Sequence, residues 1–92
     1  GMMPLFAVIC RDKPGHLSTR LETRSAHLDW LNAADMVRMA GPLVEDGEMR
    51  GSLLVIEADS LGSATAWAAG DPYKAAGLFA SVEVIEWKKV IG

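Results

Sequence analysis

The segment Gly51-Ser-Leu-Leu-Val-Ile-Glu-Ala58 decides the fold of this 92-residue chain. Its centre is apolar without a break, and it has the length of an ordinary β-strand. Because successive side chains of a strand point to opposite faces, Leu54 and Ile56 share one face. Leu53 and Val55 share the other. A strand with one solvent-exposed face alternates apolar and polar residues, so this segment predicts a strand that is buried on both faces.

The sequence on either side of this strand predicts the other elements. Apolar residues recur at helical spacing from Leu17 to Leu31. Asp46-Gly47 is a common hairpin turn, and Asp59 or Ser60 can cap the helix that follows the central strand. The predicted elements are a strand at 5–10, a helix at 17–35, a strand at 36–44 interrupted by Gly41-Pro42, the strand at 51–58, a helix at 61–69, a short helix between Asp71-Pro72 and Gly77, and a strand at 81–90.

This order, β-α-β-β-α-β, is the ferredoxin-like arrangement of the α+β class, an antiparallel sheet with two helices on one face. Two main helices are enough to cover one face only. The other face is also apolar, because Ile85 and Trp87 of the last strand oppose Val82 and Val84. We expect the sheet of a second copy to cover it, which gives a homodimer or higher oligomer built as a dimeric α+β barrel. The proline in the 36–44 strand predicts an edge strand or a bulge.

Composition limits the class of protein. The net charge is −3 and 50% of the residues are hydrophobic. Such a chain has no basic stripe for nucleic acid, and no apolar run approaches the ~20 residues that cross a membrane. The single Cys10 excludes an internal disulfide and fits a reducing compartment, so a cytoplasmic location is expected. We expect one domain over residues 2–92, with Gly1 as a remnant of tag removal because it precedes Met2.

The candidate site joins two segments that are far apart in the sequence. On the predicted long helix Arg20, Arg24 and His27 stand at i, i+4 and i+7, so they share one face. Asp71 stands where a helix N-cap is expected. If the fold brings the two segments together, Asp71 can orient the His27 imidazole for proton transfer near neutral pH. The spacing alone leaves open that His27 is only a packed or solvated residue and Asp71 only a cap.

Several short motifs, in this order, resemble the YciI-like family. The motifs are Arg24-x-x-His27-Leu28, Gly41-Pro42, Gly51-Ser52, Asp71-Pro72-Tyr73 with Gly77, and Trp87-Lys88-Lys89-Val90. The resemblance covers nearly the whole chain. It implies a dimeric ferredoxin-like α+β barrel with a histidine–aspartate active-site pair, which falls here on His27 and Asp71. It also implies a relation in fold to muconolactone isomerases, and one branch of the family is similar to a dehydrochlorinase that acts on a chlorinated hydroquinone.

Three further residues are candidates for substrate binding. Arg24 can hold a carboxylate or phenolate by charge-assisted hydrogen bonds, although a surface ion pair with Asp71 or Glu22 explains it equally well. Ser52 can donate a hydrogen bond to a ligand, but no Gly-x-Ser-x-Gly motif makes it a nucleophile. Tyr73 either lines the pocket or packs against the helix.

No cofactor and no metal ion are expected. The chain has two histidines and one cysteine, without a His-x-x-x-His or Cys-x-x-Cys spacing. It has neither a Gly-x-Gly-x-x-Gly motif nor a P-loop for a nucleotide. His16 is expected to be solvated in a loop, and Cys10 to be unreactive packing inside a strand. The three tryptophans are expected to anchor the core or an interface.

These residues predict a cofactor-independent lyase, isomerase or dehydrochlorinase-like enzyme that acts on a small aromatic or muconate-like acid. In it His27 moves a proton, Asp71 orients the imidazole and Arg24 steadies an anionic group. Whether the chain is an enzyme stays open at this point. The alternative is a non-catalytic module that binds a small metabolite or a partner protein, which the acidic composition and the implied interface fit as well. A cofactor-free monooxygenase is a third interpretation, supported by the architecture alone.

Overall fold

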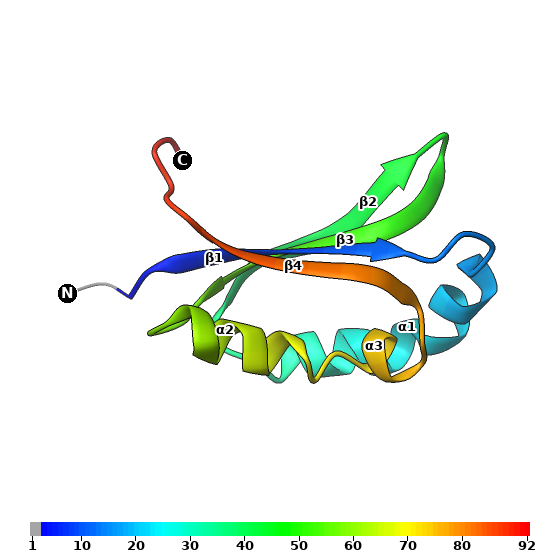
Figure 1. Ribbon diagram of the computed structural model, residues 1–92, viewed down its shortest axis with the longest axis horizontal. Coiled ribbons are helices and arrows are strands. Elements are labelled where there is room, and N and C mark those ends of the chain that lie inside the picture. The colour runs from blue at the N-terminus through cyan, green and yellow to red at the C-terminus, as the bar shows by residue number, and fades with distance from the viewer. Residues whose placement is uncertain (1–2) are drawn as a thin grey trace.

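A computed structural model of the chain describes residues 3–92, and the prediction about Gly1 lies outside them. The chain folds into one four-stranded antiparallel sheet with its helices on one side (Figure 1). The elements are β1 (Leu5–Asp12), α1 (Leu17–Asn32), β2 (Val37–Glu45), β3 (Glu48–Glu57), α2 (Leu61–Ala68), α3 (Pro72–Ala75) and β4 (Phe79–Trp87). The predicted α+β, ferredoxin-like β-α-β-β-α-β fold is confirmed.

The centre of the sheet is formed by β1 and β3, because the strand order is β2-β3-β1-β4. Val8 of β1 pairs with Leu54 of β3 on one side and with Val84 of β4 on the other. The three side chains therefore lie next to one another on the same face. This central position leaves Phe6 and Val8 almost without exposed surface.

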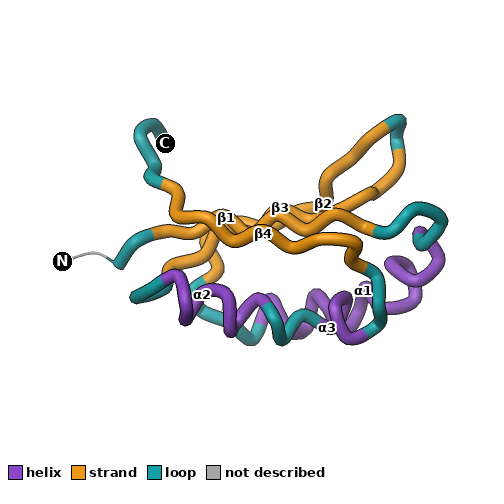
Figure 2. Tube along the Cα trace, viewed as in Figure 1, coloured by secondary structure: helices purple, strands orange, loops and turns teal. Residues whose placement is uncertain are grey.

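The core lies between the sheet and the helices, which Figure 2 shows on one side of the sheet. Alternate residues of β1 and β3 supply its sheet side, as the period of a strand requires. The buried cluster consists of Phe6, Val8, Cys10, Leu54, Ile56, Ala64 and Ala68. Trp30 and Trp67 pack against this cluster with their rings stacked at 4.2 Å. Burial of apolar surface in this layer supplies the main driving force for folding.

Side-chain caps begin two of the helices. Ser60 accepts a hydrogen bond from the Ser63 backbone N–H and caps α2, which selects it over Asp59. Asp71 caps α3 in the same way by accepting from the Tyr73 N–H at 2.9 Å, and Pro72 follows at the first helical position. The sequence pattern predicted the second cap correctly.

The β2–β3 hairpin is longer than the sequence pattern predicted. Asp46 and Gly47 both have positive φ values, 50° and 76°, which a tight type I′ turn requires. The strands therefore continue to a Glu45–Glu48 pair at the turn, so β3 begins at Glu48 and not at residue 51. Pro42 is tolerated inside β2 because β2 is an edge strand, as predicted.

Two elements end three residues earlier than predicted. α1 ends at Asn32 with Ala33 as its C-cap residue, before the predicted end at residue 35. β4 ends at Trp87, before residue 90. The physical reason for the second difference is that Trp87 pairs with Leu5, where β1 begins, so the residues beyond Trp87 have no strand to pair with.

The second face of the sheet is apolar and faces away from the helices. Ala7, Val55 and Ile85 lie side by side at its centre, because Ala7 pairs with both of the others. Around them the larger side chains are exposed, to 37% for Leu53, 51% for Ile85 and 39% for Trp87. The predicted apolar character of both faces is therefore present, and the second copy that would cover this face stays a prediction.

None of the helices in residues 3–92 is both long enough and apolar enough to cross a membrane.

We expect Gly51→Ala to destabilise the fold because Gly51 lies close to its neighbouring strands. A Cβ atom there would stand 2.3 Å from the Cys10 backbone oxygen and 2.9 Å from Leu43 Cδ1. A clash with backbone inside a sheet has no easy relief, so the free energy of unfolding should fall by about 3 kcal/mol. Gly41→Ala is the matched control, because a Cβ at Gly41 meets nothing within 4 Å. Urea unfolding of both variants measures the difference, and equal stabilities would contradict the prediction.

Candidate functional site

Two side chains 44 positions apart meet beneath the helix-covered face of the sheet. His27 projects from α1 and Asp71 stands at the start of α3, and a distance of 2.8 Å joins His27 Nδ1 to Asp71 Oδ1. The two side chains are only 7% and 3% exposed. The hydrogen bond is therefore formed away from bulk water, where it is stronger than at the surface.

The partners of Asp71 decide the tautomer of His27. Asp71 Oδ1 accepts one hydrogen bond from the imidazole and another from the Tyr73 backbone N–H. A carboxylate only accepts, so the proton of a neutral imidazole is assigned to Nδ1 and the lone pair to Nε2. The other oxygen, Asp71 Oδ2, is buried without a hydrogen-bond partner among residues 3–92. The arrangement leaves Nε2 as the nitrogen that can take up a proton.

Tyr73 forms the floor beneath the imidazole. The Tyr73 ring stacks on the His27 imidazole with centroids 4.0 Å apart and planes 19° apart. Phe79 meets the Tyr73 ring edge-on, with centroids 6.0 Å apart. Burial raises the pKa of Tyr73, while the nearby Arg20 cation works in the opposite direction. Both alternatives predicted for Tyr73 are therefore present, since it packs against α1 and also lines the cavity described below.

A buried ion pair beside this cluster was missed by the sequence analysis. Arg20 is 2% exposed and binds Asp12 with two hydrogen bonds, from Nε to Oδ2 at 2.7 Å and from Nη2 to Oδ1 at 3.0 Å. Burial alone would lower the pKa of Arg20, but the Asp12 carboxylate outweighs it and the pKa is raised. The one feature of the sequence that pointed to Arg20 as part of the site is that it shares a helix face with Arg24 and His27.

Ser52 and Arg24 occupy different surroundings although both were predicted to bind substrate. Ser52 is 1% exposed, and its Oγ accepts a hydrogen bond from Arg20 Nη2 at 2.9 Å. Its own O–H remains available as a donor. Arg24 is exposed, and within residues 3–92 it forms no ion pair, so the predicted alternative of a pair with Asp71 or Glu22 is wrong.

A cavity of about 190 Å³ opens beside His27. Its walls combine His27, Tyr73 and Ser52 with the two α1 arginines and with aliphatic side chains of the same helix. Gly41 and Pro42 of β2 also line this cavity. A base, an uncompensated cation and an apolar wall therefore face one small space.

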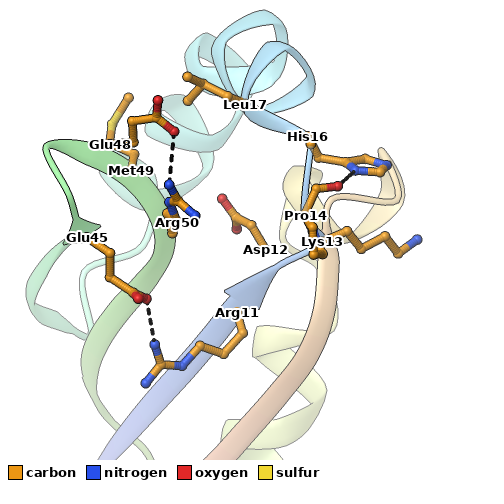
Figure 3. A pocket seen from close by; sticks show the side chains of 11 residues that line it. Arg11, Asp12, Lys13, Pro14, His16, Leu17, Glu45, Glu48, Met49 and Arg50 are labelled. Atoms are coloured by element: carbon orange, nitrogen blue, oxygen red, sulfur yellow. Dashed lines mark hydrogen bonds and ion pairs between the residues drawn. The ribbon is translucent and has the colours of Figure 1, made fainter.

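A second, larger hollow of about 380 Å³ lies at the hairpin end of the sheet (Figure 3). Its charged side chains are largely paired with each other, with Arg11 bound to Glu45 at 3.2 Å and Arg50 to Glu48 at 3.4 Å. His16 is partly exposed there, which is compatible with the expectation that it is solvated, and it donates from Nδ1 to the Pro14 carbonyl at 2.9 Å. The hollow contains neither member of the His27–Asp71 pair, so size alone does not mark the functional site.

The described part of the chain holds neither a group of metal ligands nor an exposed thiol. No three His, Cys, Asp or Glu side chains among residues 3–92 are grouped so that they could hold a metal ion. Cys10 is 2% exposed, and burial, followed by the Asp71 charge, raises its pKa to about 12. A buried thiol with such a pKa is a poor nucleophile, as predicted.

Comparisons with known proteins agree on one family. The sequence model of the YCII-related domain matches residues 4–88. The chain is 36% identical to Protein YciI of Escherichia coli O6:H1, over 94% of this chain and 98% of that protein. It is 34% identical to an uncharacterized protein of Haemophilus influenzae, over 92% of this chain and 97% of that protein.

One solved structure that resembles this chain is an enzyme. It is the 5-chloro-2-hydroxyhydroquinone dehydrochlorinase of Burkholderia phenoliruptrix, solved in complex with 2,5-dihydroxybenzoquinone. Its TM-score is 0.83 at 34% identity, and the match covers 91% of this chain and 93% of that one. A protein of unknown function from Nitrosomonas europaea matches with a TM-score of 0.57 at 20% identity, which bears on the fold alone.

The hydrogen bond to Asp71 predicts that neutral His27 carries its proton on Nδ1. Nitrogen NMR shifts distinguish the two tautomers, and His16 provides an internal comparison because it donates from Nδ1 only to a carbonyl at the protein surface. In Asp71→Ala the acceptor is lost, so the Nε2–H form should become populated. An unchanged tautomer in that variant would contradict the assigned geometry.

Proposed function

From the premise that this chain belongs to the YCII-related domain family, we propose that it is a cofactor-independent enzyme with His27 and Asp71 as its acid–base pair. The observation that carries the proposal is the buried 2.8 Å hydrogen bond between these side chains at the edge of a cavity. The likeness to a dehydrochlorinase over 91% of the chain supports a dehydrochlorinase-like reaction.

In this proposal His27 Nε2 is the general base and Asp71 is the orienting carboxylate. Asp71 holds the imidazole by its Nδ1–H and stabilises the imidazolium that forms when Nε2 takes up a proton. Stacking on Tyr73 holds the ring plane at the same time. The imidazole is thus fixed at one edge and on one face, which keeps Nε2 in one position.

The reaction that suits this arrangement is an elimination. A substrate O–H or C–H proton moves to Nε2, and the electron pair left behind forms a new double bond through the ring. The bond to the leaving group breaks with its electron pair, so the leaving group departs as an anion. His27 then releases the proton to water, which completes the loss of one acid molecule without any oxidant or reductant. Double-bond migration differs only in that His27 returns the proton to another carbon.

The cavity limits the substrate to about one six-membered ring. An engineered apolar cavity of about 150 Å³ holds one benzene molecule, and the cavity here measures about 190 Å³. The additional space accommodates a few small substituents. Drug-sized ligands generally need about 300 Å³ or more, so a larger substrate would have to extend outside the cavity.

The charges around the cavity favour an anionic substrate that Arg24 holds. Asp12 compensates the charge of Arg20, and Asp71 is turned toward His27. Arg24 lines the cavity and is the exposed cation whose charge is left for a phenolate or carboxylate. Ser52 can add a neutral hydrogen bond from its hydroxyl.

We extend the proposal to the assembly: a second copy covers the apolar outer face of the sheet and completes a dimeric α+β barrel. The support is the row of exposed apolar side chains on that face, among them Leu53, Ile85 and Trp87. Exposed contiguous apolar surface is unfavourable in a protein that stays monomeric. A two-fold dimer would pair this face with itself, as symmetric interfaces do.

His27→Gln should lower the turnover of small ring compounds that carry a hydroxyl and a halide by at least about 100-fold, because general-base catalysis contributes that much. Halide release measures the rate. His16→Gln is the matched control, since it removes the chain's other histidine at a distance from the cavity. Equal rates for wild type and His27→Gln would remove His27 from the mechanism. Binding of such compounds without any turnover would favour the non-catalytic binding module.

Ile85→Glu should dissociate the proposed dimer, because it places a charge at the centre of the outer face. Leu61→Glu is the control: Leu61 is 52% exposed, similar to Ile85 at 51%, but it lies at the start of α2 on the other side of the sheet. Sedimentation equilibrium gives the mass of each variant. A dimeric Ile85→Glu variant, or a monomeric wild type, would contradict the proposed interface.

A further inference from the structure

Arg20 keeps a permanent charge inside the domain. A buried guanidinium is strongly unfavourable unless its donors are bonded and its charge is compensated. Asp12 meets both conditions with a two-pronged contact at 2.7 and 3.0 Å, and Ser52 accepts a third bond at 2.9 Å. Such a contact fixes the plane of the guanidinium as well as its position.

The fixed guanidinium supports the Tyr73 ring. Arg20 Cζ lies 4.5 Å from the Tyr73 ring centroid, which is the geometry of a cation–π contact. Arg20 and His27 are seven residues apart on α1, which corresponds to about 10.5 Å along the helix axis. This spacing fits one aromatic ring between their side chains. Guanidinium, phenol ring and imidazole therefore form one stack in which Tyr73 is the middle layer.

The outer layer of this stack is the imidazole of His27, the general base of the proposed mechanism. The imidazole of His27 rests on Tyr73 at 4.0 Å, and its Nδ1 is bonded to Asp71. On a further side Trp30 is 6.0 Å away and tilted by 39°, too far to hold the ring plane by itself. A displacement of Tyr73 would therefore release the face of the imidazole although the bond to Asp71 remained.

We propose that Arg20, held by Asp12, is a positioning residue for His27. It fixes the Tyr73 ring, and the ring in turn keeps the imidazole plane in the orientation that directs Nε2 toward the cavity. The inference rests on the proposed function, because positioning matters only if His27 transfers a proton. Misplacement of a reacting group by about 1 Å costs roughly 100-fold in rate, so the stack is expected to affect turnover and not only stability.

The test replaces the ion pair as a unit. Arg20→Met combined with Asp12→Asn removes both charges, which avoids a lone buried carboxylate. Ring protons of His27 are shielded by the stacked Tyr73 ring, so their NMR shifts report the stack without any substrate. Tyr73→Leu defines the complete loss of this shielding, and Tyr73→Phe should retain it. Arg50→Met is the control, because Arg50 is an exposed arginine paired with Glu48.

In the double variant we expect more than half of the shielding that Tyr73→Leu abolishes to be lost. Turnover (kcat) should fall by about 10- to 100-fold, while KM stays within about twofold because Arg24 is unchanged. Retention of the full wild-type shielding would overturn the proposal. So would a lost shielding with unchanged kcat, since the stack would then have no bearing on the reaction.

A second variant covers the case in which the double variant does not fold. Arg20→Lys keeps a cation for Asp12 but lacks the planar two-pronged group, so it should lose shielding in the same way. Tyr73 is the sole tyrosine of the chain, and its phenolate absorbance therefore shows whether it stays buried. The charged groups around it are Arg20 and Arg24 on α1 and Asp71 at the start of α3. Failure of the proposed function itself would appear separately, as equal rates for wild type and His27→Gln with the stack intact.

Discussion

The rest of the site depends on the hydrogen bond between His27 and Asp71. It joins α1 to α3, and α3 is a helix of four residues that could not be stable in isolation. One oxygen of Asp71 caps α3 and binds the imidazole at the same time. The same carboxylate therefore sets the start of a helix, the tautomer of the imidazole and, through the backbone of Tyr73, the position of the ring on which the imidazole stacks.

Electrostatic compensation explains how a small domain holds this many charges. The charge of Arg20 is neutralised by Asp12 within the core. Arg20 therefore helps to hold the side chains of the site in place without adding net positive charge to the cavity. Asp71 is directed at the imidazole, and Arg24 stays exposed with its charge available. In the proposed function the site separates two tasks: buried charges hold the groups in place, and an exposed charge attracts the ligand.

The sequence predicted the parts of this structure that depend on local patterns. The uninterrupted apolar run at the centre of segment 51–58 predicted that both faces of the sheet are apolar, and the Asp71 cap followed from its place before a proline. The meeting of His27 with Asp71 needed the family resemblance, because spacing alone does not bring residues 44 positions apart together. The Arg20–Asp12 pair was missed since charged residues are normally exposed, and only the tertiary fold shows that these two are buried.

The strand alternation assigns neighbouring residues of one strand to different tasks. Ser52 lies toward the cavity, and Leu53 beside it lies on the outer face. Within residues 52–56 of β3 the even positions therefore face the cavity and the core while the odd positions face outward, so the two sets can change independently in evolution. The gain or loss of a single residue within the strand would exchange the two sets. A change of length at the hairpin tip, around Asp46-Gly47, avoids this exchange because the chain reverses there outside the paired strands.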